Sequence, residues 1–234
     1  MEIKAFISYS TADKKYGAAV KEALDGIGIK SFLAHDDLKV SEEWQKRIIA
    51  ELKQCRIFVP VLSEAFKASD WCGQETGFYV KHRQSTVLII PLSIDKTNSY
   101  GFISHIQRQP IPSTGIDPQT IVDAIGGKWP SVVIEKLLEG VDKHAHSFRE
   151  AEARIEPLVR YFEKFSKDQA ARFARIAVGN GQIWSAHLCR VEYLPEFLKL
   201  NKMKIPPSLY KALKYQVENQ AFYQADVIAR KSRR

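Results

Sequence analysis

The sequence of 234 residues predicts an α/β fold, a doubly wound parallel sheet followed by a smaller all-α region. Two observations predict this fold. In the first part of the chain, short apolar runs alternate with amphipathic stretches, which is typical of a parallel sheet covered by helices on both faces. From about residue 142 onward, the periodicity is almost only helical. We therefore expect a first domain over residues 1–141 and a helical extension or domain over residues 142–234.

Four runs rich in β-branched and aromatic residues are expected to form strands, with a short fifth strand near Gln109–Pro112. Short connections make the crossovers right-handed and predict a sheet of flavodoxin-like type. The remainder of residues 95–130 is rich in Pro, Gly, Ser and Thr and is expected to form surface loops. The four strand candidates are Lys4–Ser10, Lys30–His35, Arg56–Leu62 and Thr86–Ile94.

Helices are expected between these strands, at about Asp13–Ile27, Ser41–Cys55 and Asp70–His82. The hydroxyl of Ser41 is the expected N-cap of the second helix. Val132–Val141 also has helical periodicity.

In the helical region, we expect Ser147–Phe165 to be interrupted or kinked at Pro157. The next helix, Ser166–Val178, begins with a capping box formed by Ser166 and Gln169.

The net charge of +8 comes entirely from the last third of the chain. Residues 1–141 hold 17 Lys and Arg against 17 Asp and Glu, whereas residues 142–234 hold 18 against 10. That third has neither zinc-finger spacing nor an aromatic ribonucleoprotein motif. We therefore expect a solvated helical surface and no nucleic-acid binding.

The chain contains three widely spaced cysteines and no apolar run of the ~20 residues that a membrane span needs. An odd number of distant cysteines argues against a disulfide framework and against a zinc cluster. We expect a soluble protein in the reducing cytoplasm, without a bound metal or cofactor. The phosphate-binding, zinc-protease and serine-hydrolase motifs GxGxxG, GxxxxGK[ST], HExxH and GxSxG are all absent from the sequence.

Ligands of doubly wound sheets collect at the carboxyl ends of the strands, where loops separate and helix N-termini point inward. A binding site should therefore use the residues at the carboxyl ends of the first three strand candidates. These residues are Ser8, Tyr9, Ser10 and Thr11, then His35, Asp36 and Asp37, and finally Leu62 and Ser63.

Trp71 and Glu75 are the candidates for chemistry, because a four-residue separation places them on one face of the third helix. An indole stacks on a flat or cationic ring such as nicotinamide. A carboxylate offsets the positive charge that builds on a sugar when a glycosidic bond breaks. Since nicotinamide leaves NAD as a neutral molecule, no second acid is needed. Alone, the pair also fits a core tryptophan beside a surface glutamate.

An ordered set of motifs over residues 3–110 resembles the TIR (Toll/interleukin-1 receptor) domain family, in particular its prokaryotic members. The resemblance is carried by Phe6–Ser10 with Asp13, Ala34–Leu38, Trp44–Ile48, Cys55–Val59, Ser69–Glu75 and Pro91–Gln107.

This resemblance implies a flavodoxin-like fold and, as in many members, cleavage of NAD to nicotinamide and ADP-ribose or a cyclic ADP-ribose isomer. It also implies self-association and a role in anti-phage immunity. Glu75 matches the catalytic glutamate of the family, and Trp71 matches the tryptophan that accompanies it. By the same match, Ser8, Tyr9, Ser10 and Thr11 form the loop after the first strand, and Asp36 and Asp37 open a gating loop.

Two positions depart from the family pattern. Val40 stands where many members have glycine, and Ser10 stands where some NAD-cleaving members have arginine. The charge that binds the pyrophosphate must then come from elsewhere, for example from Lys14, Lys15 or Lys39.

The leading interpretation is an NAD glycohydrolase or ADP-ribosyl cyclase with NAD as its substrate. The helical region would then contact a partner protein or drive assembly, or would simply pack as a cap. The alternatives are a non-catalytic scaffold acting through protein–protein contacts and an enzyme that cleaves other N-glycosidic bonds.

Overall fold

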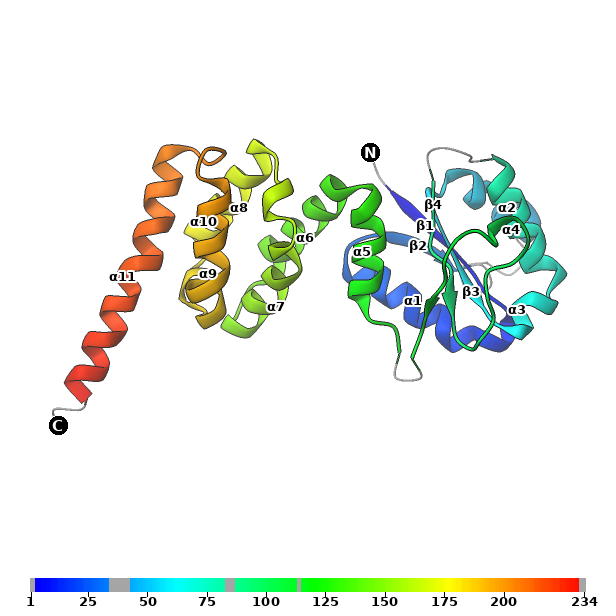
Figure 1. The fold of residues 1–234 in the computed structure, drawn as a ribbon, viewed down its shortest axis with the longest axis horizontal. Coiled ribbons are helices and arrows are strands. Elements are labelled where there is room, and N and C mark those ends of the chain that lie inside the picture. Colours follow the sequence, from blue (N-terminus) through cyan, green and yellow to red (C-terminus); the bar gives the residue numbers. More distant parts are fainter. Residues whose placement is uncertain (1–2, 34–42, 83–86, 113–114, 232–234) are drawn as a thin grey trace. The chain divides into compact units, whose positions relative to one another are not determined.

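The computed structural model describes residues 3–33, 43–82, 87–112 and 115–231, and it divides the chain into two compact units, Met1–Lys128 and Trp129–Arg234 (Figure 1). The division falls after Lys128, earlier than the boundary at residue 141 that we expected. The reason is that helix α6 (Pro130–His144) packs against helices of the second unit.

The first unit is built on a parallel sheet, which confirms the predicted fold class. The strand order is β2-β1-β3-β5-β6, and β4 pairs with β3 beside this path. The first three strands are β1 (Lys4–Ser8), β2 (Lys30–Leu33) and β3 (Ile57–Leu62). The shorter ones are β4 (Leu88–Ile89), β5 (Leu92–Ser93) and β6 (Gln109–Pro110).

The strand expected over Thr86–Ile94 is divided into β4 and β5 at Pro91. Ile90 donates its N–H to the carbonyl of Phe58, but Pro91 has no N–H to continue the ladder. Pairing with β3 resumes at Leu92. The carbonyl of Pro91 instead accepts from Gln109, and this bond leads into β6 close to where the sequence placed a fifth strand.

Helices cover both faces of this sheet (Figure 1). The expected helices are present as α1 (Lys14–Gly26), α2 (Trp44–Gln54) and α4 (Asp70–His82). The proposed N-cap, Ser41, lies outside the described residues. Two further helices, α3 (Glu64–Ala68) and α5 (Pro118–Lys128), were not expected. In α5, Ile121, Val122 and Ile125 are buried within a segment whose Pro and Gly content favoured a loop.

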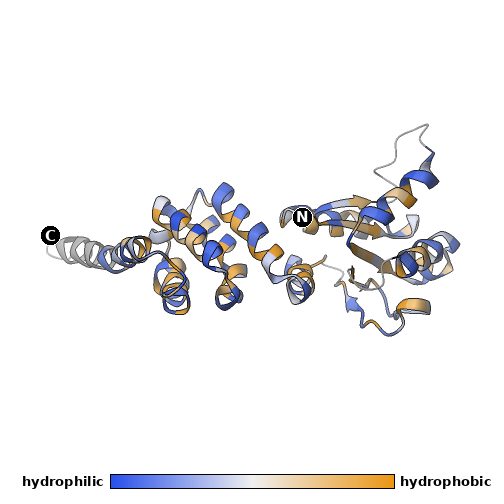
Figure 2. Ribbon diagram, turned by 90° about the horizontal axis from the view of Figure 1, so that it is seen from above, coloured by the Kyte–Doolittle hydropathy of each residue, from blue (hydrophilic) through white to orange (hydrophobic). Residues whose placement is uncertain are grey.

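A row of aromatic rings holds α4 on the sheet. Phe6 on β1 pairs in register with Phe32 and Phe58 on the neighbouring strands. Tyr79 of α4 stacks on Phe58 with ring centroids 4.8 Å apart and an interplanar angle of 21°. Burying each such side chain contributes roughly 1.5–3 kcal/mol, so this helix is firmly placed. In Figure 2 the strands are largely hydrophobic, whereas the helices carry both hydrophobic and hydrophilic residues.

The second unit is all-helical, as the sequence predicts. The capping box of Ser166 and Gln169 is present, and α7 ends two residues after Pro157. Four phenylalanine rings, Phe162, Phe165, Phe173 and Phe197, form its core. Its helices after α6 are α7 (Phe148–Val159), α8 (Lys167–Gly179), α9 (Gly181–Ser185), α10 (Leu194–Asn201) and α11 (Pro207–Lys231), with a π-helical turn at Cys189–Tyr193.

Candidate functional site

Buried polar side chains gather where β1 and β3 end. Ser8 is the last residue of β1, and its hydroxyl donates a hydrogen bond to Oε2 of Glu75 on α4. Ser63 follows β3 directly and donates to Oδ2 of Asp13 over 2.6 Å. All four of these residues are buried. Side chains far apart in the sequence therefore form one polar cluster at the edge of the sheet where ligands collect in such folds.

Glu75 is the unusual member of this cluster because it is a carboxyl group with 3% exposure and no cationic partner among the described residues. Its Oε1 atom is buried and has no hydrogen-bond partner within the part of the chain that the structure describes. A buried charge costs several kcal/mol unless it is paired, so this arrangement does not serve stability. An acid held in this way is available to a ligand.

Burial raises the pKa of Glu75 to about 7 from the ordinary value of 4.5. The Ser8 hydroxyl and the nearby Trp71 indole N–H act in the opposite direction, because both stabilise the ionised carboxylate. Trp71 Nε1 lies near the carboxyl group but makes no hydrogen bond with it. This atom is buried and has no hydrogen-bond partner among the described residues. A carboxyl group with such a pKa changes its charge near neutral pH, where its ionisation can be coupled to the binding of a cation.

Trp71 and Glu75 line the same cavity, as their spacing along α4 predicts. The cavity has a volume of about 90 Å³ and lies between α2 and α4. It combines apolar walls, an indole, a carboxyl group and two amide side chains. Its lining consists of Gln45, Ile48, Ile49 and Leu52 from α2 and Trp71, Gln74, Glu75 and Phe78 from α4.

Residues 5–117 match the family model of the TIR domain. A comparison with curated proteins yields no match. Among solved structures, the chain is similar to the TIR domain of the Toll-related receptor TRR-2 from Hydra magnipapillata. That similarity has 16% sequence identity and a TM-score of 0.42, and it covers 56% of this chain and 96% of that chain.

Residues 5–117 form a TIR domain. The family contains NAD-cleaving enzymes and non-catalytic scaffolds, so the family alone does not assign an activity. Glu75 and Trp71 lie within the matched residues.

Four candidate residues, Ser8, Tyr9, Ser10 and Thr11, lie at the end of β1 and just after it, and the structure gives them different surroundings. Ser8 contacts Glu75 directly. Tyr9 is buried, and a Cβ atom added to Gly17 of α1 would lie 3.1 Å from its ring. Because alternate residues of a strand point to opposite faces, the Tyr9 ring packs on α1, away from Glu75. The match to the family motif treated Ser8 and Tyr9 alike and did not indicate that their side chains lie in different places.

Ser10 and Thr11 lie at the surface of the same loop. Ser10 caps the short 3₁₀ helix Thr11–Asp13, since its hydroxyl accepts from the N–H of Ala12. Thr11 is exposed. His35, Asp36, Asp37, Lys39 and Val40 lie outside the described residues.

Trp44 is a neighbour of the site that the sequence did not single out for function. It is the first residue of α2, and its ring centroid lies 4.5 Å from that of Trp71. Sequence spacing could not show this contact, because it joins two helices through the tertiary packing.

The nearby Cys72 is buried, and burial raises the pKa of its thiol to about 11, so it is not a nucleophile at neutral pH.

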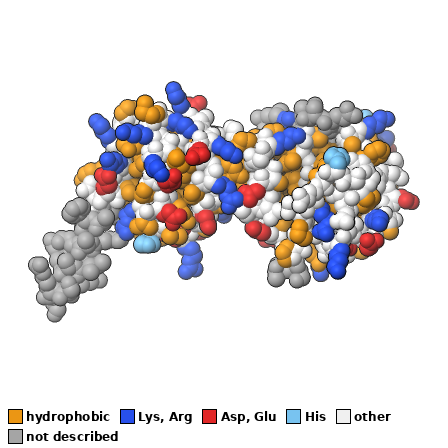
Figure 3. All heavy atoms as spheres, in the orientation of Figure 1, with side chains coloured by type: hydrophobic (Ala, Val, Ile, Leu, Met, Phe, Trp, Pro, Cys, Tyr) orange, Lys and Arg blue, Asp and Glu red, His pale blue; other side chains and the backbone are white. Residues whose placement is uncertain are grey.

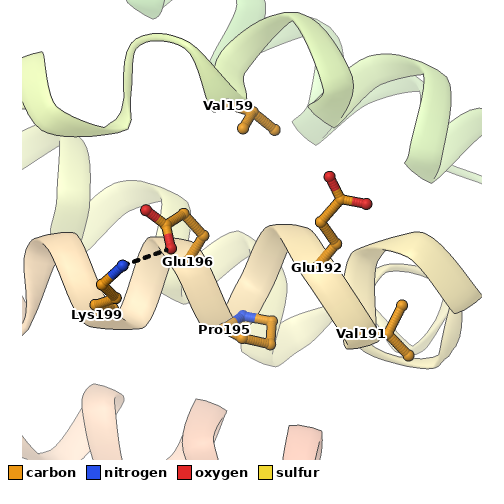
Figure 4. Close-up of a pocket in the computed structure, with 6 residues that line it drawn as sticks. All are labelled: Val159, Val191, Glu192, Pro195, Glu196 and Lys199. Atoms are coloured by element: carbon orange, nitrogen blue, oxygen red, sulfur yellow. Dashed lines mark hydrogen bonds and ion pairs between the residues drawn. The ribbon is translucent and has the colours of Figure 1, made fainter.

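A second cavity, of about 430 Å³, belongs to the helical unit (Figure 4). The Glu192 side chain points toward the side of the cavity where Val159 lies, whereas the Glu196 carboxylate turns toward Lys199 and pairs with it. The remaining lining, Val191 and Pro195, is apolar. Unlike Glu75 in the cavity between α2 and α4, neither Glu192 nor Glu196 is buried.

Within the described residues, no group of three or more His, Cys, Asp or Glu side chains could hold a metal ion. Nor is any helix of the described chain long and apolar enough to serve as a membrane span. On the face of the helical unit seen in Figure 3, Lys and Arg side chains are mixed with acidic ones and form no continuous stripe.

Proposed function

We propose that the TIR domain cleaves the bond between nicotinamide and ribose in NAD, with Glu75 as the catalytic residue. NAD is then a substrate and not a resident cofactor. The observation that carries this proposal is the state of Glu75, whose carboxyl group is buried, has one oxygen bound by Ser8 and has no partner for its other oxygen among the described residues. Trp71 lines the same cavity.

In the proposed reaction, the bond between C1′ of the ribose and the pyridinium nitrogen breaks. Its electron pair stays with the ring, so nicotinamide leaves neutral and no general acid is required. Positive charge develops on the ribose at the same time. The ionised carboxylate of Glu75 offsets this charge and accepts hydrogen bonds from the ribose hydroxyls. Water then adds to C1′ and loses a proton, which yields ADP-ribose, whereas attack by an adenine nitrogen yields a cyclic isomer.

The raised pKa of Glu75 fits this role. An acid that is half-protonated near pH 7 in the free protein becomes ionised when a pyridinium cation binds beside it. Binding of the correct substrate thereby creates the charge that the reaction uses. Trp71 supports the ring by stacking, while Ser8 holds the carboxyl group in position.

The size of the cavity supports activation by self-association. At about 90 Å³ it is well below the 300–1,000 Å³ that a typical small-molecule site occupies. The rest of the dinucleotide must then be bound outside it. We assign this part to Ser10, Thr11, His35, Asp36 and Asp37, together with surfaces that a second copy of the chain adds.

A protein of this kind depletes NAD or makes a nucleotide signal, and we propose that it does so in the cytoplasm during anti-phage defence. The helical unit would then sense a partner protein or promote assembly. If the purified chain releases no nicotinamide at any concentration, the non-catalytic scaffold replaces this proposal.

The test is to incubate the full chain with NAD and separate the products by chromatography. We expect Glu75→Gln to abolish nicotinamide release and to retain the fold. The matched control is Glu51→Gln, because Glu51 is equally buried but forms ion pairs with Lys4 and Arg47. Equal turnover by the wild-type chain and Glu75→Gln would remove Glu75 from the mechanism.

A further inference from the structure

Trp44 has an environment that the fold alone does not explain. A tryptophan side chain stabilises a protein mainly by being buried, yet Trp44 is 49% exposed at the start of α2. Its ring makes an edge contact with Trp71, with an interplanar angle of 62°. The two indoles therefore form a corner, in which Trp71 lines the cavity and Trp44 contacts Trp71 from the start of α2.

The charges around this corner favour a cationic ligand. The carboxyl group of Glu75 lies in the same cavity as Trp71. Beside Trp44 in the sequence, Glu43 just before α2 and Lys46 of α2 form an ion pair with each other and add no net charge. Indole faces attract cations through their quadrupole, and flat rings through stacking. A ring that is both flat and positively charged therefore suits the two indoles and the carboxyl group of Glu75.

We propose that Trp44 and Trp71 form an aromatic corner that selects N-alkylated, positively charged pyridinium rings over neutral nicotinamide. The proposal rests on the proposed function and adds to it a specificity-determining residue, Trp44. It also gives a physical reason for product release. When the bond to C1′ breaks, the ring takes the electron pair and loses its charge, so its attraction to both indoles and to Glu75 falls.

The test compares two ligands of nearly the same shape that differ in charge, 1-methylnicotinamide and nicotinamide. Their dissociation constants for the full chain are measured by ligand-observed NMR titration. We expect the cation to bind about 3- to 30-fold more tightly, the range that a cation–π contact supplies. Trp44→Ala should lose most of this preference, and Trp44→Phe should keep part of it.

A matched control removes another exposed aromatic side chain of the same unit. Phe102 is 72% exposed and does not line the cavity, so Phe102→Ala should leave the preference unchanged. The melting temperature of each variant shows whether the fold is intact. The proposal is overturned if Trp44→Ala keeps the wild-type preference, if Phe102→Ala loses as much as Trp44→Ala does, or if the wild-type chain binds both ligands equally.

The Glu75→Gln background separates the indoles from the carboxylate. There the preference that remains belongs to the aromatic corner, and adding Trp44→Ala should bring the two dissociation constants close together. If the chain prefers 1-methylnicotinamide but releases no nicotinamide from NAD, the proposed function is refuted and the proposal for the aromatic corner is retained. If the chain releases nicotinamide from NAD but shows no preference for 1-methylnicotinamide, only the proposal for the aromatic corner is refuted.

Discussion

The hydroxyl of Ser8 donates a hydrogen bond to Oε2 of Glu75 and so joins the end of β1 to the second turn of α4. This contact leaves Oε1 as the only carboxyl oxygen of Glu75 without a partner among the described residues. It also stabilises the ionised form of an acid that burial would otherwise keep protonated.

Replacing Ser8 should therefore change the pH dependence of the reaction. In Ser8→Ala the carboxylate loses its donor, its pKa rises further, and nicotinamide release at pH 7 should fall several-fold. Raising the pH should restore part of this loss. The measurement is kcat/KM between pH 5.5 and 9 for both proteins. Ser63→Ala, which removes a buried serine paired with Asp13, is the control, and an unshifted profile in Ser8→Ala would contradict the role of this hydrogen bond.

For the wild-type chain, kcat/KM should rise as the pH passes about 7, the pKa to which burial raises Glu75. Activity increases in this direction because the carboxylate must be ionised to offset the charge on the ribose. The profile of kcat should rise at a lower pH, since bound NAD brings a pyridinium cation beside the acid. A rate that falls as the pH rises through this range would show that the protonated acid is the active form.

Glu75 should also weaken the fold above neutral pH. Its pKa is about 7 in the folded chain against 4.5 ordinarily, so the folded state holds the proton more tightly. Stability is consequently lost as the pH rises from 4.5 to 7, by up to about 3 kcal/mol. Glu75→Gln should escape this loss and be more stable than the wild-type chain at pH 8. Hydrogen exchange of the β1 and β3 amides at pH 5 and pH 8, corrected for intrinsic exchange rates, measures this difference.

The control for that measurement is again Glu51→Gln. Glu51 is paired with two cations, so its replacement should lower stability, by about 1–3 kcal/mol after allowance for the partly exposed partners. If both variants lower the stability of the sheet at pH 8, the burial of Glu75 is not a stability cost.

A change in a helix cap of the helical unit should lower the stability of that unit without lowering the stability of the sheet. Ser166→Ala removes the capping box at the start of α8 and should cost about 1 kcal/mol. Ser166→Thr keeps the hydroxyl and should cost less. Because the chain divides into two compact units, amide protection should fall in α8 while that in β1 and β3 is retained. Equal losses in both units would show that they unfold together.

If the chain is activated by self-association, nicotinamide release per chain should rise with protein concentration, because the cavity of the described residues holds only part of a dinucleotide and we assign part of the rest to a second copy. The initial rate should be measured over a wide range of concentrations beside the molar mass from light scattering. A rate per chain that stays constant while the molar mass increases would refute activation by self-association.

The sequence by itself determined the features that depend on local periodicity. Helix α4 has the predicted bounds, Asp70–His82, and Trp71 and Glu75 share one cavity because a helix brings residues four apart to one face. The parallel strands followed from β-branched runs separated by amphipathic segments. Helix α5 could not be recognised in the same way, because its Pro and Gly residues mask a short buried face.

Only the tertiary structure decided which distant side chains meet. It placed Ser8 against Glu75 and turned the Tyr9 ring toward α1, although the two residues are adjacent in the sequence. It brought Trp44 to Trp71 and buried Glu75 deeply enough to raise its pKa. Burial and contact depend on how helices and strands pack, and packing joins residues that no local pattern relates.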